Sequence, residues 1–247
     1  MLIYANPAIV QLPLGTPEGL TLSFPGAGQV DIAAGRALIR RASGVRQIAI
    51  RTTTLRKNLF QPWAQGFNGN GLPSTVPLAA NTIYHVFLII DANGTVDAYF
   101  DTSPIAANRP SGWDARMIGS ILSTASSGVT DFDQQDNRFE YRNTIAAADT
   151  NNLTTANSNV VTLPTPSVAS ALGTIITSIA SGSATINLSA EADVTPGSWC
   201  TAMPGITLQH YWQISGNRMR LYCSNGVINT TVGIRIRGFI HPRGSQG

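Results

Sequence analysis

Three carboxylates, Asp131, Asp133 and Asp136, lie close together in a short polar segment of the sequence. Hard cations such as Ca²⁺ bind several oxygen ligands on a flexible loop, so this grouping is compatible with a calcium site. The segment lacks the central glycine and the distal glutamate of an EF-hand, and a solvated turn is the competing interpretation. The same carboxylates are the only support for polysaccharide hydrolysis, because glycoside hydrolases use paired carboxylic acids whose separation the fold sets.

No other grouping favours catalysis. His85, His210 and His241 have no second ligand at metal-binding spacing, and a Gly-x-Ser-x-Gly nucleophile elbow is absent. The glycine-rich run 66–71 has no lysine partner and no strand–turn–helix context, so a phosphate-binding loop is not indicated. The sequence therefore predicts no catalytic residue, no cofactor and no metal ligand, and hence a protein that is not an enzyme.

The glycine- and asparagine-rich loop has a second interpretation as a ligand-contact surface. Trp63 and Phe67 offer rigid apolar rings with polar neighbours, a combination that suits stacking on sugar rings. The residues of this candidate loop are Trp63, Phe67, Asn68 and Asn70. The competing interpretation is that the two aromatic rings close one end of a β-sandwich core.

Composition indicates a β-rich protein suited to packing in an assembly. Charged residues make up 12% of the 247 residues, about half the usual share, while 23 glycines and 14 prolines indicate many turns. Of the 16 basic residues only Lys57 is a lysine, and arginine suits interfaces because its guanidinium forms planar, bidentate pairs. The arginines are scattered among nearly as many acids, so we expect no nucleic-acid partner.

The two cysteines, Cys200 and Cys223, both lie in the C-terminal third. A disulfide between them is possible, but a reducing cytoplasm would leave the thiols free, and we expect two buried small apolar side chains. The first residues show no basic segment followed by a long apolar core, so no signal peptide is predicted. No apolar run reaches membrane-spanning length, and no membrane partner is expected.

The clearest structural signal is a β-hairpin around Asn93-Gly94. Apolar runs flank this dipeptide, and both of its residues tolerate the positive φ that tight hairpin turns require. Five consecutive apolar residues, 86–90, predict a strand covered on both faces. Val86, Leu88 and Ile90 should lie on one face and Phe87 and Ile89 on the other, and the two faces should be covered by the opposing sheet and by a neighbouring domain or subunit.

The rest of the chain alternates strands with turns and shows no sustained helical period. At 45–55 a period of two around Ile48 and Ile50 predicts one buried and one exposed face. The other expected strands are 20–24, 29–33, 37–41, 115–123, 129–132, 138–142, 160–163, 168–179, 183–190, 206–214, 219–224 and 230–240. Residues 56–80 are expected to form a long loop.

The expected fold class is all-β, with two antiparallel β-sandwich or jelly-roll domains in tandem. The predicted organisation is an N-terminal arm over 1–19, a first sandwich over 20–145, a polar linker over 146–159 and a second sandwich over 160–247. The arm is rich in proline and carries apolar residues that cannot form a core alone. Its candidate assembly residues are Ile3, Tyr4, Ile9, Leu12 and Leu14.

A series of strand and turn motifs resembles a family of tailed-bacteriophage virion structural proteins, which are tail-fibre-like, double β-sandwich proteins. The motifs are Tyr84-His-Val-Phe-Leu-Ile, Gly94-Thr-Val-Asp-Ala-Tyr-Phe-Asp-Thr-Ser, Pro110-Ser-Gly-Trp, Arg116-Met-Ile-Gly-Ser-Ile, Phe139-Glu-Tyr, Thr162-Leu-Pro-Thr-Pro-Ser and Arg237-Gly-Phe-Ile-His-Pro-Arg-Gly. The resemblance covers residues 80–170 well and 171–247 loosely. It implies an architecture and a place on a virus particle, and it transfers no catalytic residue.

The resemblance implies a non-enzymatic structural component of the phage, made in the bacterial cytoplasm and located in the virion. We expect a tail or tail-fibre-associated protein that forms a homo-oligomer, a trimer by family analogy, and contacts other virion proteins. The alternatives are a head decoration or fibre protein and a receptor- or glycan-binding adhesion module that contacts a host surface glycan. We also expect the N-terminal arm to dock on an adjacent chain.

Overall fold

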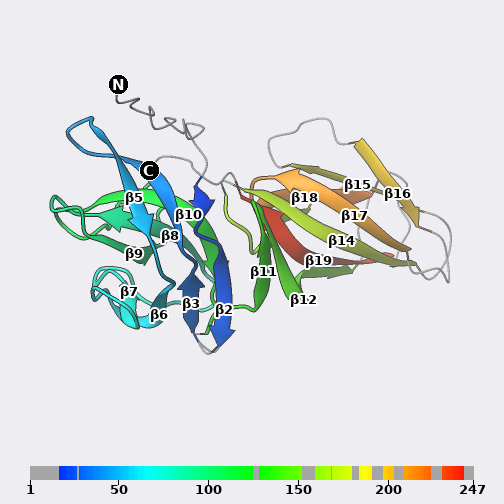
Figure 1. Ribbon diagram of the computed structural model, residues 1–247. Coiled ribbons are helices and arrows are strands. Elements are labelled where there is room, and N and C mark those ends of the chain that lie inside the picture. Colours follow the sequence, from blue (N-terminus) through cyan, green and yellow to red (C-terminus); the bar gives the residue numbers. More distant parts are fainter. Residues whose placement is uncertain are drawn as a thin grey trace, which may run out of the picture.

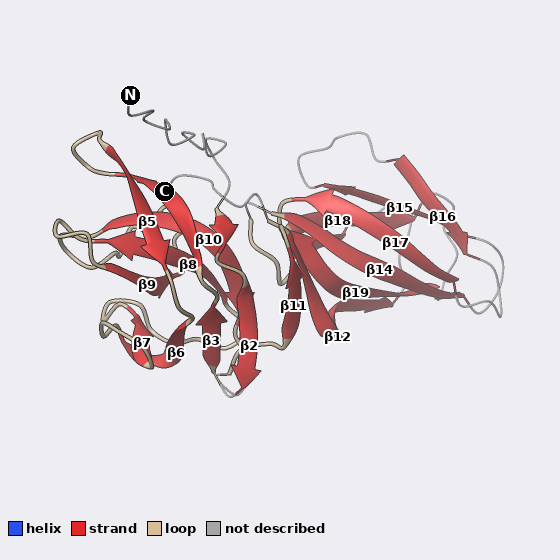
Figure 2. Ribbon diagram, viewed as in Figure 1, coloured by secondary structure: helices blue, strands red, loops and turns tan. Residues whose placement is uncertain are grey.

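The computed structural model describes residues 17–26, 28–124, 128–151, 159–167, 169–179, 184–190, 197–202, 208–223 and 230–241. All regular structure in these residues is β-strand, as the composition predicted, and Figure 2 shows no helix among them. None of them therefore forms a helix long and apolar enough to cross a membrane. The strands form two units that lie side by side in Figure 1.

The N-terminal unit consists of three small sheets. The first has the order β1 (Glu18–Gly19), β4 (Gly35–Arg40), β5 (Arg46–Arg51), and the second the order β10 (Asp114–Leu122), β8 (Ile83–Ile90), β9 (Val96–Asp101). The third has the order β2 (Leu22–Gly26), β3 (Gln29–Ile32), β6 (Leu55–Pro62), β7 (Gly69–Leu72), with a parallel pairing between β6 and β7. All other pairings in this unit are antiparallel.

The C-terminal unit is a sandwich of two antiparallel sheets. The five-stranded sheet has the order β11 (Phe132–Gln135), β12 (Arg138–Asn151), β19 (Thr230–Ile240), β14 (Ser170–Ile179), β17 (Leu208–Ser215). The four-stranded sheet has the order β13 (Asn159–Thr162), β18 (Arg218–Cys223), β15 (Ala184–Ala190), β16 (Gly197–Ala202). Ile234 and Ile236 of one sheet and Val161 and Met219 of the other belong to the same buried cluster.

The predicted hairpin around Gly94 is confirmed. β8 and β9 pair in register from Ile90–Val96 to His85–Asp101. Gly94 has φ of 87°, and the Asp91 carboxylate accepts hydrogen bonds from the backbone N–H groups of Asn93 and Thr95, at 2.9 and 2.7 Å. The turn residues therefore supply both the positive φ and a local acceptor for the backbone donors.

Strand β8 is buried on both faces, as its unbroken apolar run predicted. Val86, Leu88 and Ile90 belong to the main core cluster, whereas Phe87 and Ile89 belong to a second buried cluster. The second cluster is covered by Tyr99, Ala106, Met117 and the partly buried Trp63 and Trp113. The cover over this face thus includes loops of the same unit, in addition to strands β9 and β10.

Three expectations about the chain's organisation differ from the structure. The expected strand over 45–55 breaks at residues 52–54 into β5 and β6, and the expected loop over 56–80 contains most of β6 and all of β7. The expected linker at 146–159 begins as strand, because β12 continues to Asn151 along β19; residues 152–158 lie outside the described part of the chain. β11 and most of β12, assigned above to the first sandwich, pair within the second unit.

The two units share one hydrophobic core, in which β10 and β12 approach closely. A Cβ built on Gly119 of β10 would lie 2.9 Å from Cζ of Phe139 and 2.7 Å from Cδ1 of Leu22. Phe139 in turn stacks on Phe239 of β19 with ring centroids 4.8 Å apart. Glycine at position 119 therefore allows the first unit to contact the aromatic side chains of the second.

The strand register answers the question of the disulfide. Ile186 of β15 pairs with Cys200 of β16 on one side and with Cys223 of β18 on the other. The two cysteines are thus separated by two strand spacings, or about 9–10 Å between Cα atoms. A disulfide requires Cα atoms within about 7 Å, so the expectation of two free thiols agrees with this register.

Candidate functional site

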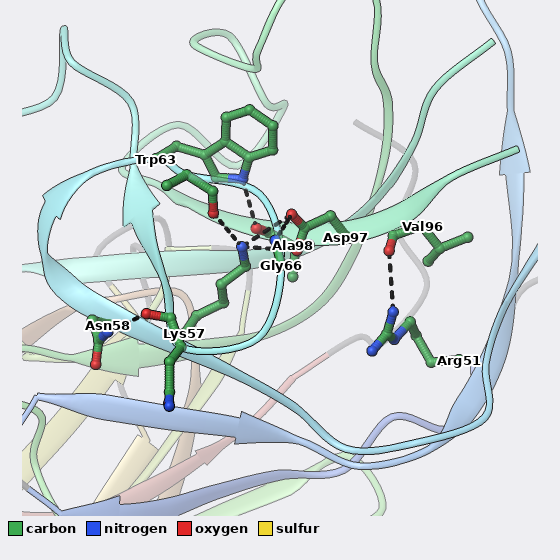
Figure 3. Close-up of polar contacts among 10 residues, drawn as sticks. Arg51, Lys57, Asn58, Trp63, Gly66, Val96, Asp97 and Ala98 are labelled. Atoms are coloured by element: carbon green, nitrogen blue, oxygen red, sulfur yellow. Dashed lines mark hydrogen bonds and ion pairs between the residues drawn. The ribbon is translucent and has the colours of Figure 1, made fainter. Parts of the chain in front are cut away.

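A buried ion pair fixes the glycine-rich loop that the sequence singled out. Lys57 of β6 and Asp97 of β9 are both fully buried, with Nζ 2.8 Å from Oδ1 (Figure 3). The Lys57 ammonium also donates to the carbonyl oxygen of Ala64, at 2.7 Å, and the Gly66 N–H donates to Asp97 Oδ2, at 2.9 Å. Both ends of the pair therefore hold the loop against the sheet.

Burial lowers the pKa of Lys57, an effect that the hydrogen bond and charge of Asp97 oppose. A buried ammonium with an adjacent carboxylate resembles a catalytic pair in composition. Here the described contacts are to the loop backbone, to the partner side chain, to the backbone N–H of Ala98 and to the Trp63 ring, and neither side chain reaches solvent. The pair therefore has a structural role, which is to hold the loop against the sheet.

Trp63 serves mainly to cover the second core cluster. Its indole N–H donates to the carbonyl oxygen of Ala98, at 2.9 Å (Figure 3). Its ring packs edge-on against Trp113 with centroids 5.5 Å apart, and the Lys57 ammonium lies 5.7 Å from its centroid. The interpretation as a plug of the core therefore fits Trp63 better than an open stacking surface does.

The other residues of the candidate loop lie at the surface. Phe67 is 58% exposed, and the Arg56 guanidinium lies 5.9 Å from its ring centroid. Asn68 is exposed with a positive φ of 58°, and its carbonyl oxygen accepts a hydrogen bond from the Asn58 amide. Asn70 is half-buried at the start of β7. Phe67 is thus exposed whereas Trp63 is half-buried, and the described ring contact of Trp63 is with Trp113.

The acidic segment forms ion pairs within the chain. Arg142 of β12 contacts Asp131 at 3.2 Å and Asp133 at 3.0 Å. The hydrogen bond and charge of Arg142 lower the pKa of Asp133. Asp136 occupies the turn between β11 and β12 with φ of 51°. Among the residues the structure describes, no three His, Cys, Asp or Glu side chains are arranged to hold a metal ion.

Two of the three histidines form a buried chain with a serine. His85 Nδ1 lies 2.8 Å from the Ser120 hydroxyl oxygen, which lies 2.9 Å from Nε2 of His241. All three side chains are buried, and burial lowers the pKa of His85 to about 4. Since His241 follows β19 and the other two residues belong to β8 and β10, this series of side-chain contacts joins the two units. His210 lies in β17.

His85 also lines a hollow between the units, with a volume of 610 Å³. Ile145 and Ala147 of β12, Leu163 and Thr165 form part of the opposite wall. Ser120 does not line this hollow, so its hydroxyl has no open path to a bound molecule there. Sequence reasoning missed this cluster because its members are 35 and 121 residues apart, and no local motif signals them.

Among the residues that the structure describes, the β4–β5 hairpin carries three of the exposed large apolar side chains. Ile48 and Ile50 of β5 are 45% and 56% exposed, and Val45 before the strand is 61% exposed. Ala49, between the two isoleucines, is fully buried opposite the buried Ala37 of β4. The period of two is therefore present, with the small residue facing inward and the large residues facing solvent.

The candidate assembly residues of the N-terminal arm, from Ile3 to Leu14, lie outside the described residues. Among the described residues, β5 is the only strand that exposes two large apolar side chains, Ile48 and Ile50. β5 is also an edge strand, since its sheet has the order β1, β4, β5.

Comparison with known proteins gives only distant structural matches. No family model and no curated protein matches the sequence. The infectious bursal disease virus T13 viral particle shows 11% identity over 92% of this chain and 67% of that chain, with a TM-score of 0.30. The VP2 subviral particle of the same virus shows 12% identity over 92% and 71%, with a TM-score of 0.26. A viral-particle protein is thus a weak structural neighbour, and a likeness at this level transfers neither a family nor a function.

Proposed function

We propose that the chain is a non-enzymatic structural component of a tailed-bacteriophage particle, assembled as a homo-oligomer and associated with the tail or tail fibre. The sequence motifs that resemble phage virion proteins support this proposal. They fall largely on strands and turns of the described structure, including β8, β9, β10 and the start of β12. The all-β architecture with a continuous core across two units is compatible with a role in which packing, and not chemistry, is the function.

The exposed face of β5 is the observation that carries the proposal. Full burial of a side chain such as isoleucine contributes about 1.5–3 kcal/mol, so the half-exposed Ile48 and Ile50 forgo part of this contribution while the chain is alone. An edge strand that presents such residues invites association unless another surface covers it. We assign that cover to a second copy of this chain in the assembly.

The presence of the chain in particles tests the proposal. Quantitative mass spectrometry of purified virions should find the chain in a fixed ratio to the other virion proteins. Its absence from particles, or a ratio that varies between preparations, would contradict a structural role. Labelling with an antibody on intact virions would then separate a tail position from a head decoration.

The N-terminal arm provides a second route to attachment. Deletion of residues 2–17 should leave both β-units folded, because the first described strand begins at Glu18 and the hydrophobic core begins at Leu20, and should prevent incorporation into particles. Normal occupancy of the truncated chain would show that the arm is not the anchor.

A second candidate function is binding of a host surface glycan, and exposed Phe67 is the observation that favours it. Phe67 lies on a loop of glycines and asparagines that a buried ion pair holds in place, which is a suitable setting for a rigid stacking surface. Phe67→Ala is the appropriate variant, because Trp63 is part of the core cover. Glycan-array binding that survives this substitution would remove the loop from the binding site.

A further inference from the structure

A basic cleft lies at the free end of the N-terminal unit, between the turn of the β4–β5 hairpin and the loop that precedes β10. The hairpin projects away from the C-terminal sandwich in Figure 1. Three adjoining hollows of 820, 330 and 440 Å³ surround the loop, and Arg109 lines all three. The largest is also lined by Arg41 and Trp113, and the smallest by Arg40 and Arg41.

The walls of this arginine cleft, formed by Arg40, Arg41, Arg109 and Trp113, are held by buried contacts. The fully buried Asp101 accepts two hydrogen bonds from Asn108, one from its backbone N–H and one from its side-chain amide, each at 2.9 Å. Asn108 directly precedes Arg109, so the base of the loop is fixed. Trp113 is fixed on the other side by its edge-on contact with Trp63.

Arg41 is also held in a defined position. Its guanidinium donates to the Asp114 carboxylate at 3.1 Å, to the Gln47 side chain and to the carbonyl oxygen of Asp91. Asp114 additionally accepts the backbone N–H of Ala42, at 3.0 Å. One of the cleft's three guanidiniums is therefore neutralised and rigid.

The other two guanidiniums lack such neutralisation. Arg40 and Arg109 are exposed, and no carboxylate among the described residues forms an ion pair with either of them. Arg40 also lies directly opposite Arg46 across the hairpin, where like charges are unfavourable. Asp114 is the only carboxylate that lines the three hollows, against three guanidiniums, while Asp101 is buried beneath the loop. The exposed guanidiniums at the surface of the cleft therefore favour an anion.

We propose that the arginine cleft binds a sugar that carries a carboxylate. Arg109 and Arg40 would receive the carboxylate, because the planar guanidinium matches a carboxylate in bidentate geometry. Trp113 lines the largest hollow and offers an aromatic ring on which a sugar could pack, and Ser43 and Ser111 line the same hollow. The remaining lining includes small or apolar residues, which leave room for a ring.

The shape and charge of the cleft favour a saccharide over a nucleic acid. Nucleic-acid surfaces follow the phosphate backbone with a continuous basic stripe or a series of stacking aromatic rings. This cleft has two arginines without an ion-pair partner, one aromatic ring in its largest hollow and a second, Trp63, in the 440 Å³ hollow, and these form neither a continuous stripe nor a series. The proposal shares only its ligand class with the glycan-binding candidate above. Failure of the proposal would therefore contradict neither the structural role nor glycan binding at the Phe67 loop.

Calorimetric titration of the purified full-length chain with tetragalacturonate tests the proposal, with the methyl-esterified tetramer as the neutral probe. We expect the acid to bind, the ester not to bind, and affinity to fall as salt increases. Arg40→Ala combined with Arg109→Ala should weaken binding by at least about tenfold, because charge-assisted hydrogen bonds are lost. Trp113→Phe, which keeps a smaller aromatic ring, should bind the acid with part of the wild-type affinity. Arg138→Ala, which alters an exposed arginine outside the cleft, should bind like wild type.

We expect the double arginine variant to fold, since Arg40 and Arg109 contribute to no described ion pair. Circular dichroism of each variant verifies this. Three results would overturn the proposal: no binding of the acid by the wild-type chain, equal binding of acid and ester, or unchanged affinity in the folded double arginine variant. A single-stranded oligonucleotide that displaces the acid and binds more tightly would also overturn it, and would identify the cleft as a phosphate-backbone site.

Discussion

Strands β8 and β5 are both rich in isoleucine, yet their side chains have opposite environments. β8 is covered on both faces, by the main core on one side and by Trp63, Trp113 and Ala106 on the other. β5 is covered on one face only, where Ala49 meets the core and leaves Ile48 and Ile50 exposed. The comparison shows that isoleucine in a strand stabilises the fold in one case and lies exposed at the surface in the other.

The largest expected difference comes from placing the same charge on each strand. Leu88→Asp should give no soluble folded protein, because an unpaired buried carboxylate costs several kcal/mol, which is on the order of a domain's total stability. Ile48→Asp should change the free energy of unfolding by less than about 1 kcal/mol, because the site is 45% exposed in the isolated chain. Soluble yield and thermal unfolding followed by circular dichroism measure both effects. A folded Leu88→Asp variant would contradict the two-sided burial of β8.

The buried ion pair beneath the loop should respond more strongly than an exposed pair. Asp97→Asn leaves the Lys57 ammonium buried without its counter-charge and should destabilise the fold by about 3–5 kcal/mol. The double variant Lys57→Met, Asp97→Asn should recover much of that loss. Arg138→Ala, which breaks the exposed pair with Glu140, should cost less than about 1 kcal/mol.

Urea unfolding of these three variants gives the free energies for a double-mutant comparison. An Asp97→Asn variant as stable as Arg138→Ala would show that the pair does not anchor the loop. A double variant less stable than Asp97→Asn alone would show that the Lys57 ammonium stabilises the fold more through its hydrogen bond to the Ala64 carbonyl than through the Asp97 carboxylate.

His85 should make stability depend on pH. Its pKa is about 4 in the folded chain because of burial, against 6.5 for an unperturbed histidine, so the unfolded chain binds the proton more readily. The contribution of neutral His85 to the free energy of unfolding is fully present above about pH 7. It is lost as pH falls toward 4, by about 2 kcal/mol between pH 7 and pH 5. His85→Gln should reduce the loss in this interval when urea unfolding is measured at each pH. An unchanged pH dependence in the variant would assign the effect to other groups.

The smallest expected effect concerns the two cysteines. Their strands lie on opposite sides of β15, so both thiols should react with a thiol reagent in denaturant without prior reduction. The expected count is two thiols per chain, with no change on addition of a reductant. A lower count before reduction would contradict the register of β16 and β18.

Local sequence patterns predicted much of the strand content. The run 86–90 identified a strand with two buried faces, and the alternation before Ile240 located β19 at its observed bounds. At Ile48 and Ile50 the period of two was correct, but the pattern could not show which face is buried. The opposed pair Ala37 and Ala49 decides this, because two small side chains let the hairpin lie close to the core.

The tertiary clusters were not predictable from sequence because topology, and not spacing, brings their members together. Lys57 and Asp97 are 40 residues apart, and Ser120 and His241 are 121 residues apart. The loop over 56–80 was expected to lack strands because its glycines and asparagines indicate turns. In the structure Gly69 and Asn70 pair with β6, and a buried charge holds the loop between them.

The molar mass of the purified chain tests the central claim, that the exposed face of β5 is an assembly contact, most directly. Size-exclusion chromatography with light scattering should show the wild-type chain as an oligomer, and the variant carrying Ile48→Asp and Ile50→Asp as a monomer with an unchanged circular dichroism spectrum. A wild-type chain that remains monomeric at all concentrations, or a double variant that keeps the wild-type mass, would contradict the account.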